Sequence, residues 1–171
     1  YFLNGQIVSG ATLYQPPTVQ RDLTRWTPAF LDWSATNIEK ETDRSAKAGT
    51  SIHQTLKTYL TTRTTTARRR WVIENDGSGE IADLIVLEVR GAYEVSIELW
   101  HAKPASGANT SVRVTDMEVV VAQAIKSRRW LTERELWQEM ADRYSGLSSP
   151  ALKLIDGSES LLRALLGLVP G

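Results

Sequence analysis

Three side chains in the middle of the sequence have the types and spacing needed for phosphoryl chemistry. Asp83 follows Ile81 and precedes Leu84, and a carboxylate among apolar residues is costly to bury unless it is paired or bound to a metal. His101 and Lys103 are two residues apart in a segment rich in strand-forming residues, so a strand would direct both side chains to one face. Phosphodiester hydrolysis needs hard cations held by oxygen ligands, an activated water and positive charge near the phosphate. These residues therefore predict a site for such a reaction.

The expected roles follow from the chemistry of each group. Asp83 would supply the first oxygen ligand to Mg²⁺ or Mn²⁺, and Glu80, just after Gly77-Ser-Gly79, would supply a second directly or through water. Lys103 would lower the pKa of the attacking water or stabilise charge on the scissile phosphate. His101 is a further candidate ligand. The predicted metal ligands are thus Asp83, Glu80 and His101.

Four residues are candidates for contacts around this site. Gln123 interrupts an apolar stretch on a predicted helix, which favours a functional role, although a polar surface residue is the alternative. Arg113 could hold a phosphate or pair with Asp116. Arg68 and Lys126 belong to basic runs that could contact DNA, although short charge runs usually only solvate the end of a strand or helix.

Structural interpretations of the central residues remain open. A buried aspartate near a lysine is often a structural ion pair, and a single histidine at a strand end is more often a satisfied imidazole than a ligand. His53 has no neighbouring residue that supports a functional role. The shared strand face of His101 and Lys103 favours the functional interpretation.

The elements that must position these residues can be read from periodicity and turn residues. A hairpin is expected within residues 2–14 around Asn4-Gly5, followed by an irregular connector to residue 36. A helix is possible over 37–47. A second helix should follow, capped by Thr50 or Ser51 and with its apolar residues at helical spacing: Ile52, Leu56, Tyr59 and Leu60. Three consecutive strands are predicted to start at Trp71, to span 81–89 and to span 93–103. Helices are predicted over 114–130, 132–144 and 158–168.

In these motifs the chain resembles the PD-(D/E)xK, restriction-endonuclease-like nucleases. Within that family it resembles a nuclease domain attached to prokaryotic helicases in defence-type systems. The resemblance rests on Gly77-Ser-Gly-Glu-Ile-Ala-Asp83, Glu98-Leu-Trp-His-Ala-Lys103, and the stretch from Arg113 to Gln123, and it covers about residues 33–130. It implies an α+β fold with a central, mostly antiparallel sheet flanked by helices. It also implies DNA cleavage, with Asp83 as the central metal ligand and Lys103 as the motif lysine.

The sequence departs from that family at one position. The acid expected two residues before the lysine is His101, and Glu98 would face the opposite side of an unbroken strand. His101 could itself bind a softer ion such as Mn²⁺, a displaced acid such as Glu80 or Glu41 could replace it, or catalysis could be lost. We favour the displaced acid. A catalytically inactive domain that binds nucleic acid or docks a partner is the alternative function.

Composition sets the remaining expectations. Lys plus Arg and Asp plus Glu are equal at 20 each, so any affinity for nucleic acid must be local. The chain has no cysteine and no apolar run long enough to span a membrane, which favours a cytoplasmic protein.

We expect an N-terminal hairpin and connector over 1–36 and a nuclease-like domain over 37–171. Since the sequence begins at Tyr1, it is expected to be part of a longer chain that includes a helicase or another module. The apolar stripe of the 158–168 helix would need a partner surface, and it is the one hint of a purely structural interaction domain.

Overall fold

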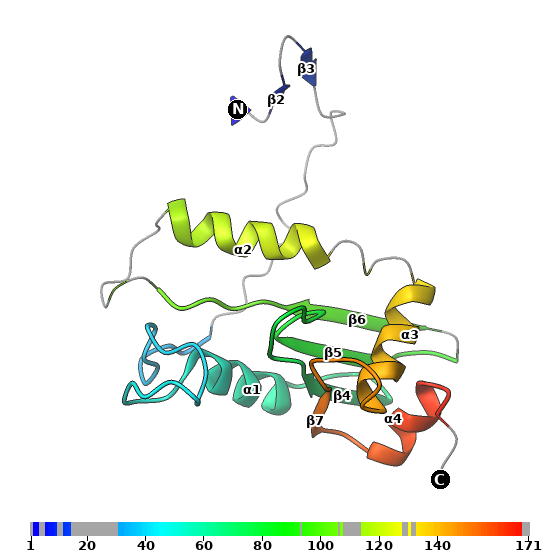
Figure 1. Cartoon of the computed structure of the whole chain (residues 1–171). Coiled ribbons are helices and arrows are strands. Elements are labelled where there is room, and N and C mark those ends of the chain that lie inside the picture. Colours follow the sequence, from blue (N-terminus) through cyan, green and yellow to red (C-terminus); the bar gives the residue numbers. More distant parts are fainter. Residues whose placement is uncertain are drawn as a thin grey trace. The chain divides into compact units, whose positions relative to one another are not determined.

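The chain forms two compact units, Tyr1–Leu31 and Asp32–Gly171. The computed structural model describes the following residues: 2–3, 6–9, 12–14, 31–92, 94–105, 107, 114–127, 130 and 133–168. Figure 1 shows the elements of both units.

The first unit contains a small antiparallel sheet with strand order β1-β2-β3. Its strands are β1 (Phe2–Leu3), β2 (Gln6–Ser9) and β3 (Thr12–Tyr14). Phe2 pairs with Ile7 and Leu3 with Gln6, so the predicted hairpin around Asn4-Gly5 is confirmed by the residues on either side of that turn. The third strand was not predicted, and most of the connector, 15–30, lies outside the described residues.

The second unit is a mixed α+β fold built on a four-stranded antiparallel sheet, as expected for the general class. The strand order is β6-β5-β4-β7. The strands are β4 (Arg69–Glu74), β5 (Leu84–Val89), β6 (Val95–Trp100) and β7 (Lys153–Asp156). The helices are α1 (Ile52–Thr62), α2 (Val114–Ser127), α3 (Glu133–Tyr144) and α4 (Glu159–Leu165). The predicted order of one helix, three antiparallel strands and a further helix is therefore present.

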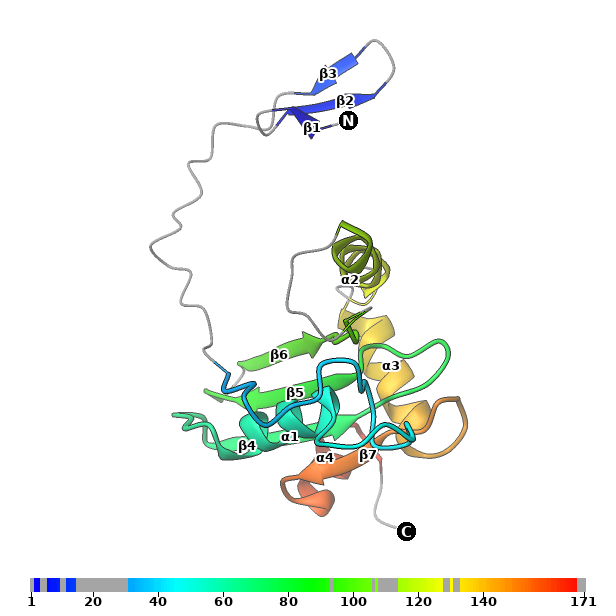
Figure 2. The same cartoon turned by 90° about the vertical axis from the view of Figure 1, so that its left-hand side faces the viewer.

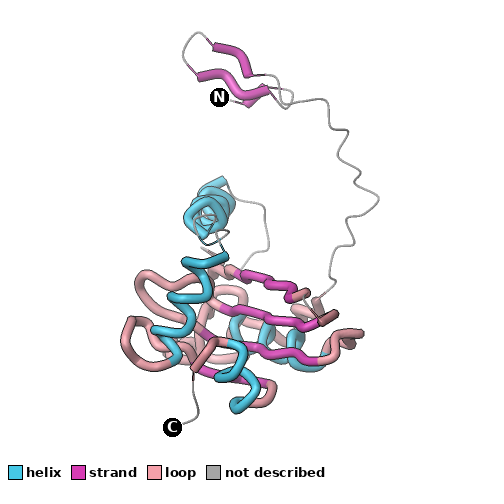
Figure 3. Tube along the Cα trace, turned by 90° about the vertical axis from the view of Figure 1, so that its right-hand side faces the viewer, coloured by secondary structure: helices cyan, strands magenta, loops and turns pink. Residues whose placement is uncertain are grey.

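Helices cover both faces of this sheet. Figures 2 and 3 show α1 on one face and α3 and α4 on the other, while α2 lies beyond the edge strand β6. Alternate residues of β5 point to opposite faces, and Ile85 and Leu87 join the core beneath α3 and α4 together with Trp71 and Met140. Burial of these large side chains is the main stabilising contribution to the fold.

The apolar stripe of α4 is covered within the chain itself. Leu162 and Leu166 are buried, and Leu161 and Leu165 pack against the same core. This packing removes the one sequence feature that had suggested an external partner for this helix.

The segment before α1 is irregular, so the helix suggested for 37–47 is wrong. Asn37 accepts a hydrogen bond from Glu39 N at Oδ1 and donates one from Nδ2 to Ala48 O. Its own N–H bonds to Thr50 O at 2.9 Å. Such side-chain bonds to the backbone compete with helical hydrogen bonds, and no apolar stripe is present to offset that competition. The result is a folded loop that ends at the start of α1.

The central strands are shorter than predicted. β5 begins at Leu84 and β6 ends at Trp100, so Asp83, His101 and Lys103 lie just outside the ladder and not within it. Beyond β6 the backbone bonds to the loop before α1, through Ala105 N to Ile38 O at 2.8 Å. This bond brings the segment after His101 alongside the loop that carries Glu41.

Among the described residues, none of the helices has the length and apolar character needed to span a membrane.

Candidate metal centre

Asp83 is the central group of the site. Its side chain is 2% exposed, and its Oδ2 accepts one hydrogen bond, from Ala102 N at 2.8 Å. The backbone of Asp83 is fixed as well, because its carbonyl accepts from Asn75 N at 3.1 Å. A buried carboxylate with a single backbone donor needs further positive or donor groups to offset its desolvation.

The two histidines of the chain approach different oxygens of this carboxylate. His101 Nδ1 lies 3.6 Å from Asp83 Oδ2, and His53 Nε2 lies 3.9 Å from Asp83 Oδ1. His53 comes from the first turn of α1 and His101 from the residue after β6. Both separations exceed a hydrogen bond, so neither imidazole satisfies the carboxylate directly.

The tautomer of His101 is set by Ser127 at the end of α2. His101 Nε2 is 2.6 Å from Ser127 Oγ, and that hydroxyl donates to Ile81 O at 3.0 Å. Since the single hydroxyl proton points to Ile81, Ser127 must accept the Nε2 proton of His101. A neutral ring then has its free lone pair on Nδ1, facing Asp83. Metal-binding histidines are commonly oriented in this way by a partner on the other nitrogen.

Two glutamates complete groups of possible metal ligands around Asp83. Glu80, Asp83 and His101 offer three ligand atoms that all lie within 4.8 Å of one another, and so do Glu41, His53 and Asp83. Asp83 belongs to both groups. The structure therefore contains clusters of acidic and imidazole side chains that could hold a metal ion.

Lys103 joins the same cluster through Glu41. Its ammonium donates to Glu41 Oε1 at 2.5 Å. Burial by itself lowers the pKa of Lys103, but the bond to Glu41 and the charges of Asp83 and Glu80 outweigh it and hold that pKa above its usual value. The lysine is therefore a fixed positive charge at neutral pH.

The pKa of Asp83 reflects the same neighbours. Burial raises it, but the His101 imidazole, the Ala102 N–H and the charges at His53 and Lys103 together bring the pKa below its usual value.

The loop that carries Glu80 is held by a buried arginine. Arg143, 4% exposed, donates to Gly79 O at 2.8 Å and to Asn75 Oδ1 at 3.2 Å. Asn75 Oδ1 also accepts from Ile81 N at 2.8 Å. These bonds fix the backbone on both sides of Glu80, so α3 positions a candidate ligand without contacting the cluster itself.

A cavity opens beside the cluster. It has a volume of about 400 Å³ and is lined by Gly79, Glu80, His101, Gln123, Lys126, Ser127 and Trp130. Gln123 is half-buried, and its Oε1 is a buried atom without a hydrogen-bond partner. The exposed Lys126 lies on the same wall. Gln123 and Lys126, which the sequence suggested as contacts around the site, thus line the same cavity as two of the predicted metal ligands, Glu80 and His101.

The other candidates lie elsewhere. Arg68 is exposed, and its N–H bonds to Val89 O, which places it at the opposite end of β5 from Asp83. Arg113 lies outside the described residues. Glu98 faces away from the cluster as its spacing suggested, because it accepts hydrogen bonds from Arg63 at 2.8 Å and Trp100 Nε1 at 2.9 Å.

Sequence reasoning set His53 aside and named Glu41 only as one possible replacement acid. The structure brings both to Asp83, because His53 N bonds to Glu41 O at 3.0 Å and so joins the start of α1 to the preceding loop. One signal was available: His53 is the second residue of a capped helix immediately before the three strands. Ser127 also belongs to the site, because it sets the tautomer of His101. No sequence pattern around Ser127 indicated this role.

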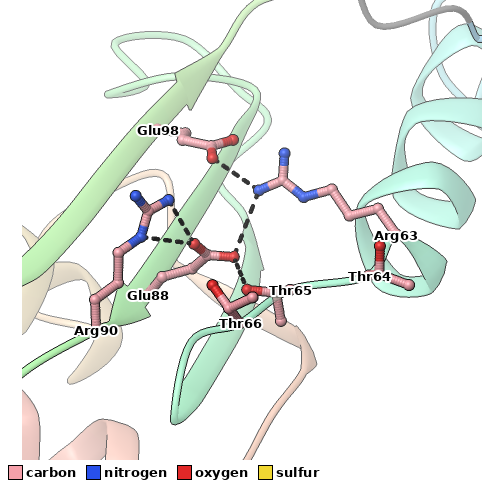
Figure 4. A pocket seen from close by; sticks show the side chains of 7 residues that line it. All are labelled: Arg63, Thr64, Thr65, Thr66, Glu88, Arg90 and Glu98. Carbon is pink, nitrogen blue, oxygen red and sulfur yellow. Dashed lines mark hydrogen bonds and ion pairs between the residues drawn. The ribbon is translucent and has the colours of Figure 1, made fainter.

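A second polar cavity, of about 360 Å³, surrounds Glu88 near the far end of β5. Figure 4 shows Glu88 between Thr65, Arg90 and Arg63, with Arg63 also reaching Glu98. Glu88 accepts hydrogen bonds from Thr65 Oγ1 at 2.8 Å and from Arg90 Nη2 at 3.0 Å. Every carboxylate here has a cationic partner from the protein, so this cavity has the character of a structural ion-pair network.

A scan against protein-family models and searches of curated proteins and of solved structures find no match to this chain.

Proposed function

We propose that the chain is a divalent-metal-dependent nuclease that hydrolyses phosphodiester bonds of DNA. The observation that carries the proposal is the arrangement around Asp83: a buried carboxylate shared by two groups of possible metal ligands, with the Lys103 ammonium in the same cluster. The order α1, β4, β5, β6, α2 also agrees with a restriction-endonuclease-like core, and that fold is part of the proposal.

In this proposal Asp83, Glu80 and His101 hold Mg²⁺ or Mn²⁺, which would supply Lewis acidity and an activated water. Ser127 keeps the Nδ1 lone pair of His101 directed to Asp83, as described above. Lys103 provides a positive charge close to the reacting phosphate, where charge develops in the transition state. Glu41 orients the lysine through their ion pair.

In this proposal another acid replaces the motif acid that is absent at His101. Glu80 and Glu41 each lie in a group with Asp83, so a displaced acid can supply the oxygen that His101 does not. The cavity beside Glu80 provides room for a nucleotide phosphate, with Lys126 on its wall. From the sequence resemblance, we further propose that the domain acts as the effector of a prokaryotic defence or helicase-nuclease assembly.

Cleavage assays test the proposal. Supercoiled plasmid and end-labelled oligonucleotides are incubated with Mg²⁺, Mn²⁺ or EDTA, using wild type, Asp83→Ala and Lys103→Ala. Glu98→Gln is the matched control, because Glu98 is a strand acid whose partners lie outside the cluster. We expect metal-dependent cleavage by wild type and the control, none by Asp83→Ala and strongly reduced cleavage by Lys103→Ala. Equal activity in all four proteins would exclude this site.

A second candidate is a catalytically inactive domain that binds nucleic acid or docks a protein. The observation that favours it is His101 at the position of the motif acid. This candidate predicts DNA binding that persists in EDTA and in Asp83→Ala, with no cleavage under any metal. A metal affinity that disappears in Asp83→Ala would argue against it.

A further inference from the structure

Gln123 carries a buried polar atom that the fold leaves without a partner. Its Oε1 accepts no hydrogen bond, and among the described residues only His53, His101 and Arg70 also have buried atoms of this kind. Both histidines belong to the ligand groups around Asp83, whereas Gln123 belongs to neither group. Burying an acceptor without a donor is unfavourable, so this oxygen indicates a ligand that donates a hydrogen bond.

One face of α2 presents Gln123 to the cavity beside the metal centre. Gln123, Lys126 and Ser127 are three and four residues apart, so the helix places them on one face. All three line the cavity, and Trp130 lines it as well. The Ser127 hydroxyl already makes two hydrogen bonds within the fold. The groups that this wall offers to a ligand are therefore an amide, an ammonium and an aromatic ring.

These three groups match the parts of an adenine nucleotide. The cavity volume of about 400 Å³ lies within the range of about 300–1,000 Å³ typical of small-molecule sites. A glutamine amide can bond two edge atoms of adenine, because its oxygen accepts from the N6 amino group while its nitrogen donates to N7. An indole such as that of Trp130 can stack on a base. An ammonium such as that of Lys126 suits the phosphate.

The other residues of the cavity place this site next to the candidate metal centre. Glu80 and His101 also line it, and both belong to a ligand group with Asp83. A strand whose phosphodiester lies at those ligands would have an adjoining base within reach of the cavity, since base and phosphate belong to one nucleotide. A base can enter such a cavity only when it has left the stack, as in a single strand or a flipped nucleotide.

We propose that this cavity binds the adenine base of the nucleotide next to the scissile phosphate, with Gln123 bonding the edge of the base and Trp130 stacking on its ring. The word scissile rests on the proposed nuclease function, whereas recognition of the base requires neither a metal nor cleavage. The site would give the protein a preference for unstacked adenine.

Binding of short single strands in EDTA tests the proposal without cleavage. One strand is an oligothymidine, and the other is the same strand with a single central adenine. Their affinities for the whole chain are measured by fluorescence anisotropy. We expect wild type to bind the adenine strand about 5–150-fold more tightly, the discrimination typical of one bidentate contact to a base. Gln123→Ala should bind the two strands equally.

Three further variants sharpen the test. Gln123→Glu keeps an acceptor but has no donor for N7, and a carboxylate suits the N4 amino group of cytosine, so it should prefer a strand with a central cytosine. Trp130→Leu keeps an apolar side chain where Trp130 packs against the core, and it should weaken binding of the adenine strand by about 5–150-fold. Gln138→Ala is the matched control, because Gln138 is an exposed glutamine of α3 bonded to Asp142, and it should keep the adenine preference.

Several results would overturn the proposal. They are equal binding of both strands by wild type, no binding of either strand, an adenine preference that survives in Gln123→Ala, or undiminished binding by Trp130→Leu. Failure here is distinct from failure of the nuclease. An adenine preference without metal-dependent cleavage would leave the base site and remove the nuclease, whereas cleavage without a base preference would leave the nuclease and remove the base site.

Discussion

Two buried carboxylates, Glu88 and Asp83, occupy opposite ends of the central strand β5 and differ in what surrounds them. Glu88 is 4% exposed and Asp83 2%. Glu88 receives hydrogen bonds from a threonine and an arginine of the protein, as Figure 4 shows. Asp83 receives one backbone N–H and faces two imidazoles that stand too far away to bond. Burial alone therefore does not distinguish the two carboxylates, whereas the unsatisfied side chains around Asp83 do.

The pKa values alone would not distinguish these two ends. Burial raises the pKa of Glu88, but Thr65, Arg90 and Arg63 outweigh it and bring that pKa below its usual value. The pKa of Asp83 is lowered as well. The difference lies in the partners: fixed cations at Glu88, and at Asp83 two imidazoles that lie beyond hydrogen-bond distance.

The largest effect is expected from removing the ammonium at the Asp83 end. Lys103→Ala should reduce DNA cleavage by about 10²–10³-fold, because one preorganised charge near the phosphate is lost, while Mn²⁺ affinity measured by calorimetry does not fall. Lys57→Ala is the matched control, since Lys57 also pairs with a glutamate, Glu74, at 2.5 Å. Equal losses in both lysine variants would mean that the effect is structural.

A smaller effect is expected from the residue that orients His101. Ser127→Ala should weaken Mn²⁺ binding by about 10–100-fold, because His101 is no longer held with its Nδ1 lone pair towards Asp83. Thr58→Ala, which removes an exposed hydroxyl bonded to Gln54 O on α1, should leave Mn²⁺ affinity unchanged. An unchanged affinity in Ser127→Ala would remove His101 from the ligand set.

At the other end of the sheet the expected effect is on stability. Glu88→Gln should lower the free energy of unfolding at pH 7 by about 1–3 kcal/mol, because Arg63 and Arg90 lose their charged partner, without changing metal binding or cleavage. Since the folded-state pKa of Glu88 is lowered, its contribution is present above the unfolded-state pKa and is lost as pH falls through the folded value. Denaturant unfolding from pH 7 to pH 3 should therefore show a shallower acid decline in Glu88→Gln. A decline as steep as that of wild type would show that Glu88 does not stabilise the fold in this way.

The smallest expected effect distinguishes the basic residues at the two ends. Lys126 lines the cavity beside Glu80, whereas Arg68 lies at the Glu88 end. Lys126→Ala should reduce the slope of log binding constant against log salt by about 1 for short duplex DNA, and Arg68→Ala should not. The reverse result would place the nucleic acid at the Glu88 end of the sheet.

Much of the second unit could be predicted from local patterns. Ser51 caps α1 by accepting from Gln54 N at 3.0 Å, and Ile52, Leu56 and Leu60 are buried on one face, as their spacing indicated. The strands β4, β5 and β6 follow runs of β-branched and aromatic residues. These features were predictable because each depends on residues close together in sequence.

The remainder depends on contacts between distant residues. β7 has only four residues, Lys153–Asp156, and it exists because it pairs with β4, which no local pattern reveals. The segment 37–47 is fixed by bonds from Asn37 to Ala48 and Thr50. Asp83 was identified as a carboxylate among apolar residues, and His101 and Lys103 through strand spacing. His53, in contrast, reaches Asp83 because α1 packs beside the sheet.

The most direct test of the account is calorimetric titration of Mn²⁺ into wild type, Asp83→Asn and Glu88→Gln. Asparagine keeps the oxygen that accepts from Ala102 N, so the fold should survive while the shared ligand is lost. The account predicts that Mn²⁺ binds to wild type and to Glu88→Gln with equal affinity, and does not bind measurably to Asp83→Asn. Undiminished binding in Asp83→Asn, or equal weakening in both variants, would contradict a metal centre at Asp83.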